Sequence, residues 1–380
     1  MKATSRNRRR VAVVTGSRAE YGLLKSCMTA IARHSRLELQ LVAAGMHLLR
    51  KSGFTVRDIE RDGWSIDARI RMQRGDDSST DQAEGLACGV TGMARFFEES
   101  ATDIVVVLGD RIEAMAAALA ATSVAKILAH IHGGDVAPGD ADGRMRDAIT
   151  KLAHVHFAAS KSAARRIVRM GEEPKRVFEV GAPGLDRLAA LARGRRPKRS
   201  GMCLVLQHPC GRAAATEREV MNNILAAVDA SHLRPVIVYP NTDRGHSGIV
   251  KAIEEYQTRH AENGAVFFRS MNHDDYLRTL IDAEVIVGNS SSGVIEAASA
   301  RTPAVNVGDR QQGRERSGRS VVDAGESSRS IARAIQTALR RRPRWGAPTV
   351  YGDGRGGVQL AETLATLPLD DRFRRKCVVR

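Results

Sequence analysis

The stretch VAVVTGSRAEYGLLKSCMTAIAR, residues 11–33, decides the fold class of this chain. Its first five residues form an apolar, β-branched run that favours a buried strand, whereas residues 21–33 have the spacing of an amphipathic helix. The polar turn GSRAE joins the two segments. A buried strand that leads through such a turn into a helix is the repeating unit of a parallel α/β sheet.

The same alternation of strand and helix continues on both sides of one interruption. The predicted strands are residues 11–15, 38–43, 104–108, 127–131, 155–159 and 177–180, then 203–206, 235–239, 265–268, 285–287 and 304–307. Helices are predicted at 21–33, 113–123, 144–153, 161–170, 216–230, 248–260 and 274–282. The interruption is the basic segment RGRRPKRS at 193–200, whose composition is that of a linker. The pattern predicts an α/β protein with two Rossmann-like domains, whose parallel sheets face a central cleft.

Composition limits the class of protein. The chain has 380 residues, 43% hydrophobic and 27% charged, as in globular proteins and unlike disordered or collagen-like ones. It has no apolar run of about 18 residues, so we expect no membrane span. We find no apolar core of a signal peptide either, so we expect a cytoplasmic protein. The five cysteines form no CxxC pair, and we expect free thiols.

The charge of the chain is strongly positive. The 59 Lys and Arg residues exceed the 43 Asp and Glu residues, which gives a net charge of +16. Such an excess suits nucleic acid, a membrane surface or an anionic small substrate. Only 4% of the residues are aromatic, and they are not interleaved with the basic runs. Base stacking is therefore poorly supported, and we favour a small anionic substrate over nucleic acid.

Polar, glycine-rich turns follow seven of the predicted strands. They are GSRAEY at 16–21, GDR at 109–111, HGGD at 132–135, QHP at 207–209, PNTD at 240–243, GNSSSG at 288–293 and GDR at 308–310. Loops are polar in general, but this does not explain why glycine and charged residues recur together at strand ends. Open parallel sheets bind ligands beyond the carboxyl ends of their strands, so these turns are the candidate site.

The turn at 288–293 is a candidate phosphate site. Its serines can cap a following helix, whose N-terminus offers free N–H groups and the positive end of a dipole. A plain capped turn would use the same residues. Arg18, Arg111 and Arg310 at neighbouring strand ends favour the phosphate interpretation, because guanidinium forks match a diphosphate. Glu296, one turn into the helix, could accept both hydroxyls of a ribose.

Several carboxylates are candidate acids or bases. Asp110 follows an apolar strand, and burial at a sheet edge can raise the pKa of a carboxyl group. Pairing with Arg111 or capping of a helix is the alternative role for Asp110. Asp135, Asp140 and Asp142 lie in a Gly-rich loop, where two carboxylates could remove one proton and deliver another.

Metal and cofactor motifs are missing from the sequence. His130, His132, His154 and His156 form two His-x-His pairs, but no thiolate or Glu completes a familiar ligand spacing, so we expect no metal. There is no GxGxxG after the first strand, no GxxxxGK[ST] and no GxSxG. We therefore expect no nicotinamide or other cofactor.

Seven motifs in order make the chain resemble the hydrolysing UDP-N-acetylglucosamine 2-epimerases, from about residue 11 to about residue 356. They are GSRAEYG at 16–22, LGDR at 108–111, HIHGG at 130–134, AITKL at 148–152, QHP at 207–209, GNSSSG at 288–293 and GDRQ at 308–311. The resemblance implies a glycosyltransferase-B-like fold, a homodimer or homotetramer, and a place in sialic-type acid biosynthesis. No redox cofactor is needed for the implied reaction.

The resemblance also implies a domain organisation. A basic tail at 1–10 precedes an N-terminal Rossmann-like domain at 11–192, which carries the catalytic carboxylates. A linker at 193–200 leads to a C-terminal Rossmann-like domain at 201–345, which binds UDP. The last segment, 346–380, is expected to return to the first domain.

Single residues take their expected roles from the same resemblance. Asp110 and Asp142 match the catalytic carboxylates, and His132 and Asp135 assist beside them. The residues expected to bind the UDP-sugar are Arg18, Arg111, His208, Asn241, Ser290, Ser291, Ser292, Glu296 and Arg310. The implied reaction removes the C2 proton of the sugar as UDP leaves C1. Water then adds to the 2-acetamidoglucal and releases the free C2-epimer, N-acetylmannosamine.

The chain departs from the family pattern in one region. Asp135 stands where relatives have Glu, Gly143 replaces another Glu, and Asp147 replaces His. These changes leave the donor open, and a UDP-2,4-diacetamido-2,4,6-trideoxyglucose of the legionaminic acid type would suit the chain equally well. A non-hydrolysing epimerase, a glycosyltransferase, and an inactive UDP-sugar sensor or nucleic-acid-binding protein are the competing hypotheses for the whole chain.

Overall fold

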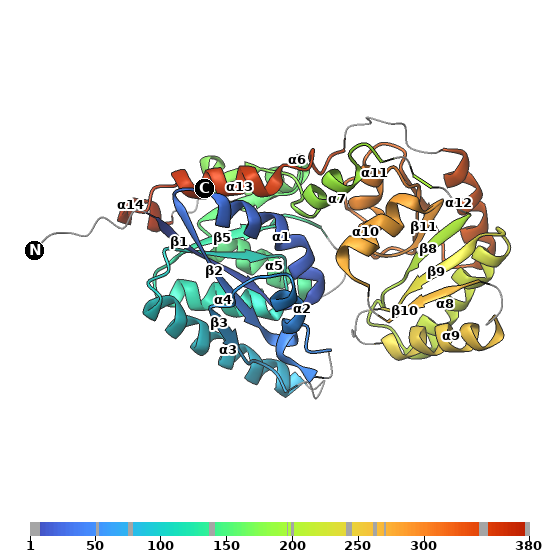
Figure 1. The fold of residues 1–380 in the computed structure, drawn as a ribbon, viewed down its shortest axis with the longest axis horizontal. Coiled ribbons are helices and arrows are strands. Elements are labelled where there is room, and N and C mark those ends of the chain that lie inside the picture. Colours follow the sequence, from blue (N-terminus) through green and yellow to red (C-terminus); the bar gives the residue numbers. More distant parts are fainter. Residues whose placement is uncertain are drawn as a thin grey trace, which may run out of the picture. The chain divides into compact units, whose positions relative to one another are not determined.

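The computed structural model describes residues 8–50, 53–74, 79–136, 141–195, 197–198, 201–240, 245–260, 264–269, 271–341 and 349–376, without the side chains of residues 79, 141 and 142. The chain divides into two compact units. Unit 1 combines the described residues of Met1–Val136, Asp140–Asp186 and Gly354–Arg380, and unit 2 contains those of Arg187–Asp353. Each unit is built around its own parallel sheet (Figure 1).

The sheet of unit 1 has seven strands in the order β3-β2-β1-β4-β5-β6-β7. They are β1 (Arg9–Thr15), β2 (Leu37–Ala44), β3 (Ala68–Ile70), β4 (Ile104–Leu108), β5 (Ile127–Ile131), β6 (Val155–Ala158) and β7 (Val177–Glu179). Every neighbouring pair is parallel, for example β1 with β4, where Val11 lies opposite Ile104. Alternate residues of β1 enter two different cores, Val11 one and Ala12 the other, so both faces of the sheet are buried.

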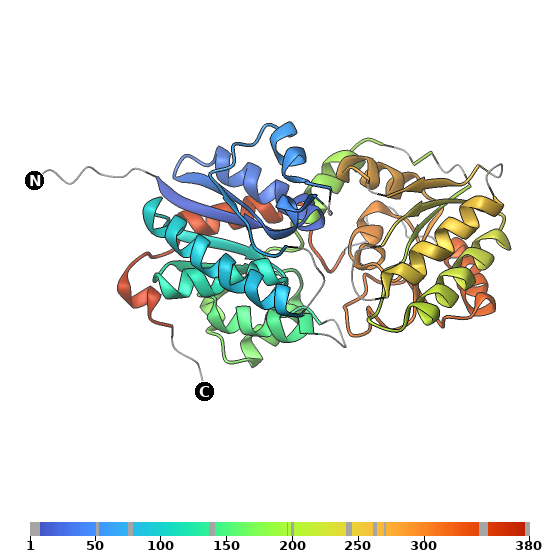
Figure 2. The ribbon, with the colours of Figure 1, turned by 90° about the horizontal axis from the view of Figure 1, so that it is seen from below.

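Helices cover both faces of this sheet (Figure 2). They are α1 (Arg18–Arg33), α2 (Val56–Arg61), α3 (Ser79–Glu99), α4 (Ile112–Ser123), α5 (Ala141–Leu152) and α6 (Lys161–Arg169), with the 3₁₀ turns Gly45–Leu48 and Pro174–Arg176. The C-terminal part of the chain adds α13 (Gly356–Thr366) and α14 (Asp371–Arg374) to unit 1. Helix α7 (Gly184–Ala192) leads from unit 1 into unit 2.

Helix α13 lies against α1, although more than 300 residues separate them in sequence (Figure 1). Leu360, Ala361 and Leu364 of α13 enter the same core as Leu24 and Met28 of α1. Gly357 allows the close approach, because a Cβ there would lie 2.7 Å from the backbone carbon of Ser26. The end of the chain is therefore part of the first unit's core.

The sheet of unit 2 has six strands in the order β10-β9-β8-β11-β12-β13, again all parallel. They are β8 (Met202–Leu206), β9 (Arg234–Val238), β10 (Val266–Phe268), β11 (Val285–Gly288), β12 (Ala304–Val307) and β13 (Val321–Ala324). The helices are α8 (Ala214–Asp229), α9 (His246–Arg259), α10 (His273–Asp282), α11 (Glu296–Ala300) and α12 (Ser328–Arg340), with a 3₁₀ turn at Ser291–Gly293.

The predicted fold class is confirmed, since both sheets are parallel and carry alternating helices. The strands predicted from sequence do not include β3 and β13, which are the edge strands of the two sheets. Both are short, at three and four residues, and mostly half-buried, so neither forms a continuous apolar run. Among the described residues, no helix is long and apolar enough to span a membrane.

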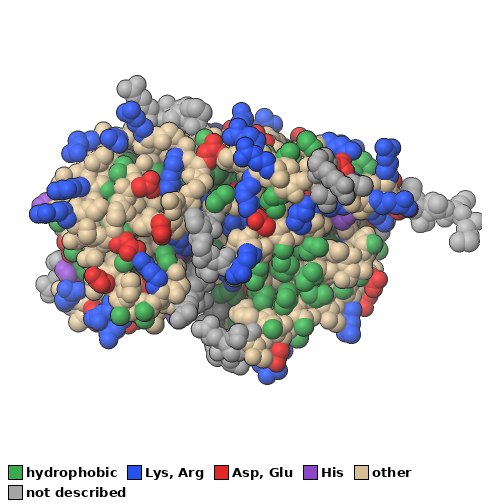
Figure 3. All heavy atoms as spheres, turned by 180° about the vertical axis from the view of Figure 1, so that it is seen from behind, with side chains coloured by type: hydrophobic (Ala, Val, Ile, Leu, Met, Phe, Trp, Pro, Cys, Tyr) green, Lys and Arg blue, Asp and Glu red, His purple; other side chains and the backbone are tan. Residues whose placement is uncertain are grey.

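Basic side chains are dispersed on the face that Figure 3 shows. Lys and Arg residues lie among acidic and apolar ones over both units. Among the residues drawn in colour on this face, they form no continuous stripe of the kind that would track a nucleic-acid backbone.

Candidate active site

Each sheet has a topological switch point, where the strand order reverses beside its central strand. In unit 1 this point lies between β1 and β4, and in unit 2 between β8 and β11. Connections leave the two neighbouring strands towards opposite faces there, which opens a crevice at their carboxyl ends. The turns at 16–18, 109–111, 207–209 and 288–293 all lie at these two points. The candidate site residues therefore fall where parallel sheets bind ligands.

Asp110 forms an ion pair at the end of β4, but not with the neighbouring residue. Its carboxylate meets the guanidinium of Arg146, which lies on α5 and is only 5% exposed. Nη1 of Arg146 also donates to the backbone oxygen of Asp135, at 3.0 Å. Helix α5 thus brings a buried guanidinium to this turn as the partner of Asp110. Arg146 thus joins two candidate catalytic carboxylate positions.

His132 and Asp135 form a buried dyad. Nδ1 of His132 lies 3.0 Å from Oδ2 of Asp135, and the two residues are 8% and 9% exposed. An ionised carboxylate only accepts hydrogen bonds, so Nδ1 of His132 is the donor in this contact. His132 has a φ of 63°, the left-handed region that is costly for a residue with a side chain. The turn holds this strained residue in place.

The two glycines of the HGG motif make that turn possible. A Cβ on Gly133 would lie 2.9 Å from both Nδ1 of His130 and Oγ1 of Thr150. A Cβ on Gly134, whose φ is 75°, would lie 2.4 Å from the backbone oxygen of Ala163. Both positions therefore exclude a side chain, and the turn packs tightly between β5, α5 and α6.

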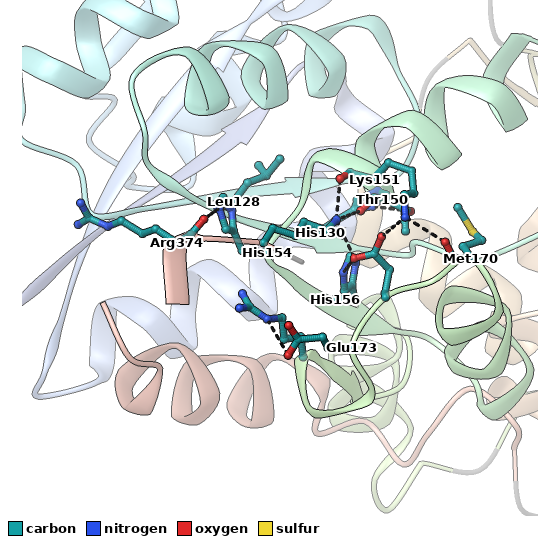
Figure 4. A network of polar contacts seen from close by, with 12 residues as sticks. Leu128, His130, Thr150, Lys151, His154, His156, Met170, Glu173 and Arg374 are labelled. Atoms are coloured by element: carbon teal, nitrogen blue, oxygen red, sulfur yellow. Dashed lines mark hydrogen bonds and ion pairs between the residues drawn. The ribbon is translucent and has the colours of Figure 1, made fainter. Parts of the chain in front are cut away.

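The remaining histidines of the two His-x-His pairs are engaged by other groups (Figure 4). Nε2 of His130 lies 2.7 Å from the backbone oxygen of Gly109, and burial lowers the pKa of His130 to about 3. His156 contacts Glu172 at 3.1 Å, and Nδ1 of His154 accepts from the backbone N–H of Leu128. Within the described parts of the chain, no group of three or more His, Cys, Asp or Glu side chains is placed to hold a metal ion.

Asp147, one of the departures from the family pattern, is neutralised by α6. Arg166 donates two hydrogen bonds to its carboxylate, at 2.6 and 2.7 Å. The pair with Asp147 raises the pKa of Arg166 above its usual value. The negative charge of Asp147, which stands where relatives have His, is therefore balanced by the guanidinium of Arg166 within unit 1.

The arginines after β1 and β4 are held by acidic residues. Nε of Arg18 lies 3.6 Å from Oδ2 of Asp58. Nε of Arg111 lies 3.4 Å from Oε2 of Glu113, and its Nη2 lies 3.0 Å from the sulfur of Met46. The two guanidinium groups are 34% and 37% exposed, so each is partly open to solvent at the switch point.

Sequence reasoning missed two buried carboxylates beneath this crevice. Glu113 is 0% exposed, and its Oε1 lies 3.4 Å from both the backbone N–H of Met46 and the side-chain amide of Gln73. Glu20 accepts from the backbone N–H of Gly16 at 2.7 Å. Glu20 stands inside the GSRAEY motif, and Glu113 comes just after GDR at 109–111. Their position at or directly after polar strand-end turns was the available signal.

The carboxyl group of Glu20 should make stability depend on pH. Burial, reinforced by the charge of Glu113, raises the pKa of Glu20 from 4.5 to about 8. Between these values the folded chain keeps a proton that the unfolded chain releases, so the free energy of unfolding falls as pH rises. Glu20→Gln, which has no proton to lose, should be more stable than the wild type by roughly 1–3 kcal/mol at pH 8, with no gain at pH 4.

Urea unfolding of the wild type and of Glu20→Gln at several pH values from 4 to 8 measures this difference. Glu98→Gln on the exposed side of α3 is the matched control and should show a constant difference. A Glu20→Gln curve that runs parallel to the wild-type curve over the whole range would contradict the raised pKa.

Asn289 organises the switch point of unit 2. This residue is 0% exposed, and its side chain accepts from the backbone N–H of His208 at 2.7 Å and donates to the backbone oxygen of His208 at 2.8 Å. Its own backbone oxygen accepts from Nη1 of Arg310 at 3.2 Å and from Nε2 of Gln311 at 2.9 Å. Asn289 therefore ties together the turns that follow β8, β11 and β12. Sequence reasoning assigned it no role.

His208, whose backbone is bonded to Asn289, carries a neutral imidazole. Burial, and to a lesser extent the charge of Arg310, lowers the pKa of His208 to about 3. A neutral ring next to a guanidinium adds a polar contact without repelling it. The structure thus brings His208 and Arg310, both predicted site residues, to one point.

The serine-rich turn differs from its prediction. Residues Ser291–Gly293 form a 3₁₀ turn, and the α-helix begins only at Glu296 and ends at Ala300. Oγ of Ser290 accepts from the backbone N–H of Ser292 at 3.3 Å, and Oγ of Ser292 accepts from the hydroxyl of Tyr276. The expected α-helix N-terminus at these serines is therefore wrong: a short 3₁₀ turn comes first, and the α-helix begins after it.

Glu296 opens the short helix α11 and lies close to Tyr276. Burial, together with the charge of Glu296, raises the pKa of the Tyr276 hydroxyl. Glu296 itself is 8% exposed. Its carboxylate thus stands in the same small region as the serines of the turn.

The family model of UDP-N-acetylglucosamine 2-epimerase matches residues 29–365. The chain belongs to this family. The expectation of an epimerase is thereby confirmed.

Named relatives cover almost the whole epimerase. The UDP-N,N'-diacetylbacillosamine 2-epimerase (hydrolyzing) of Legionella pneumophila is 33% identical over 97% of this chain and 99% of that protein. The UDP-N-acetylglucosamine 2-epimerase of Neisseria meningitidis serogroup B is 30% identical over 87% of each chain. A crystal structure of the Neisseria meningitidis UDP-GlcNAc 2-epimerase bound to UDP-GlcNAc superposes with a TM-score of 0.78 at 15% identity, covering 93% of this chain and 99% of that one. The epimerase shares the fold of that protein.

Three candidate site residues of the epimerase lie wholly or partly outside what the structure describes. Asp140 and Asn241 fall in undescribed segments, and only the backbone of Asp142, the second residue of α5, is described. Their predicted roles stay predictions.

Proposed function

We propose that this epimerase hydrolyses a UDP-linked N-acetylated amino sugar, releasing UDP and the free C2-epimer of the sugar. The observation that carries the proposal is the buried cluster of unit 1. There Arg146 pairs with the carboxylate of Asp110 and donates to the backbone of Asp135, whose side chain orients His132. A reaction that takes a proton from one face of C2 and returns one to the other needs two such acid–base groups.

In the proposed first step, a base removes the C2 proton while the C1–O bond to UDP breaks, which leaves a C1–C2 double bond. Asp110 and Asp142 are the carboxylates proposed to exchange protons with C2, and Arg146 is the counter-ion of Asp110. His132, oriented by Asp135, assists with the lone pair of its Nε2. In the second step, water loses a proton to one of these groups as its oxygen adds to C1, and another of them gives its proton to the opposite face of C2.

The departing UDP needs stabilisation because negative charge grows on its diphosphate. We assign this role to the switch point of unit 2, where Arg310 is fixed by the backbone of Asn289. Ser290, Ser291 and Ser292 offer hydroxyls and N–H groups of the 3₁₀ turn, and Glu296 is proposed to bind the ribose. His208 contributes a neutral imidazole. Arg18 and Arg111 are also proposed to bind the UDP-sugar, and Asn241 the nucleotide.

For the donor, we favour UDP-N,N'-diacetylbacillosamine, the 2,4-diacetamido-trideoxy sugar considered above. The supporting observation is the similarity to the Legionella pneumophila protein, which extends over 97% of this chain. The second candidate is UDP-N-acetylglucosamine, which is favoured by the similarity to the Neisseria meningitidis protein at 30% identity.

A proton NMR time course in D₂O tests the proposal with each donor in parallel, without added metal or NAD. We expect free UDP and a free sugar that carries deuterium at C2, faster with the diacetylated donor. Release of UDP from UDP-N-acetylglucosamine alone would replace the favoured donor by the second candidate. An epimerised sugar that stays attached to UDP would indicate a non-hydrolysing reaction. No change in either donor would refute the catalytic proposal and favour a UDP-sugar sensor.

A further inference from the structure

The C-terminal segment 370–376 is attached to unit 1 by a set of specific contacts. The guanidinium of Arg176 lies over the ring of Phe373, 4.2 Å from its centroid, and donates to the backbone oxygen of Phe373 at 2.7 Å. Nε2 of His154 lies 3.1 Å from the backbone oxygen of Arg374. Asp370 caps the short helix α14 by accepting from the N–H of Phe373. These contacts deliver Lys376 to the end of α5.

Lys376 completes the C-terminal end of α5. Its Nζ donates to the backbone oxygens of Lys151 at 2.6 Å and Thr150 at 3.2 Å. The last carbonyl groups of a helix lack partners within the helix, and the negative end of the helix dipole favours a cation. Ile149 already accepts from the N–H of Ala153. The next two carbonyl groups, those of Thr150 and Lys151, therefore accept hydrogen bonds from a lysine up to 226 residues away in sequence.

The same ammonium group is tied to a buried carboxylate. Nζ of Lys376 lies 2.6 Å from Oε2 of Glu172. The carboxylate of Glu172 also contacts His156 and Lys151. Burial alone would raise the pKa of Glu172, but the hydrogen bonds from these three partners outweigh it and bring the pKa to about 2. Glu172 is therefore ionised at neutral pH, and it holds Lys376 in place.

From this end of α5, a series of polar contacts leads to the candidate catalytic cluster. Thr150, one turn after Arg146, has its Oγ1 2.9 Å from the backbone oxygen of Arg146 and 3.2 Å from Nδ1 of His130. The other ring nitrogen of His130 donates to the backbone oxygen of Gly109, next to Asp110, because a carbonyl oxygen only accepts. Helix α5 and the turn after β4 are thus held against each other beside the ion pair of Arg146 with Asp110.

We propose that Lys376 is a positioning residue for catalysis: it fixes α5 so that Arg146 meets Asp110. The inference rests on the proposed function for its kinetic test. Lys376 touches no part of the cluster itself and acts through α5. Lys376→Met should lower kcat about 10- to 100-fold, the scale on which a displacement of about 1 Å in the reacting groups acts. The affinity for UDP should stay unchanged, because the groups assigned to UDP at the unit 2 switch point do not depend on α5.

Three variants make the test specific. Lys376→Arg keeps the cation and should recover most of kcat, whereas Glu172→Gln removes the anchor and should reproduce the loss. Lys175→Met is the matched control, since Lys175 also pairs with a neighbouring glutamate, at 2.8 Å, but is 76% exposed. Measurements are kcat and KM with the active donor, the Kd of UDP, and the melting temperature of each variant.

A loss of kcat with the Kd of UDP unchanged, together with recovery by Lys376→Arg, supports the proposal. A kcat of Lys376→Met within twofold of the wild type overturns it. A parallel loss of kcat and UDP affinity also overturns it, since a general loss of structure would do the same. If Lys376→Met does not fold, an unchanged kcat in Glu172→Gln overturns the proposal and a reduced one supports it.

Hydrogen exchange of α5 separates this inference from the proposed function. Amides of residues 141–152 should exchange faster in Lys376→Met than in the wild type or in Lys175→Met, whatever reaction the protein catalyses. If the wild type consumes neither donor but α5 is protected by Lys376, the proposed function fails and the structural inference stands. Equal exchange in all variants overturns the role of Lys376.

Discussion

Asp110→Asn is expected to lower kcat by at least about a hundredfold, the usual scale of a general acid–base group. An amide of the same shape cannot take the C2 proton, and it leaves the buried guanidinium of Arg146 without its counter-ion. The affinity for UDP should be largely kept, because the groups assigned to the diphosphate in unit 2 remain. Turnover is measured as UDP release from the active donor, and UDP affinity by calorimetry.

The control for this variant is Asp275→Asn, which changes an exposed aspartate at the start of α10. It should leave kcat and UDP affinity at wild-type values. Near-normal turnover in Asp110→Asn would remove Asp110 from the mechanism. A matching loss of UDP affinity would mean that the carboxylate serves binding rather than proton transfer.

Gly288→Ala, which adds one methyl group, should strongly destabilise the switch point of unit 2. Gly288 has a φ of 139°, and a Cβ there would lie 2.1 Å from the backbone oxygen of Leu206. The new methyl group must push β8 and β11 apart, where Gly288 and Leu206 are paired. Backbone strain and overpacking together should lower the free energy of unfolding by about 2–6 kcal/mol. UDP affinity should fall as well, because Asn289 follows directly and holds His208 and Arg310, both proposed to bind UDP.

Gly211→Ala separates the steric clash from the backbone conformation. Gly211 also has a positive φ, 75°, but a Cβ there meets nothing within 4 Å. This variant should cost only about 1–2 kcal/mol and leave UDP affinity unchanged. Urea unfolding and calorimetry with UDP measure both variants. Equal losses in the two variants would show that the close contact with Leu206 is not what requires glycine at 288.

Much of the candidate site could be predicted from the sequence because the fold has a simple rule. A buried strand followed by a polar, glycine-rich turn places that turn at the carboxyl edge of a parallel sheet. Asp110 and His208 were found in this way, and the structure places both at or beside a switch point. The identity of each partner could not be found so, since it depends on which helix crosses which turn. The pairing of Asp110 with Arg146 could not be found from the sequence for this reason.

The alternation of apolar strands and helices, and the polar turns at their ends, were determined by the sequence alone, since they follow from local patterns of burial. Three features were decided only by the tertiary structure: the pairing of Asp110 with Arg146, the hub of Asn289, and the capping of α5 by Lys376. Each joins residues between 21 and 226 positions apart in the chain. Such contacts form only when packing brings distant segments together, because no local spacing encodes which buried charge meets which partner.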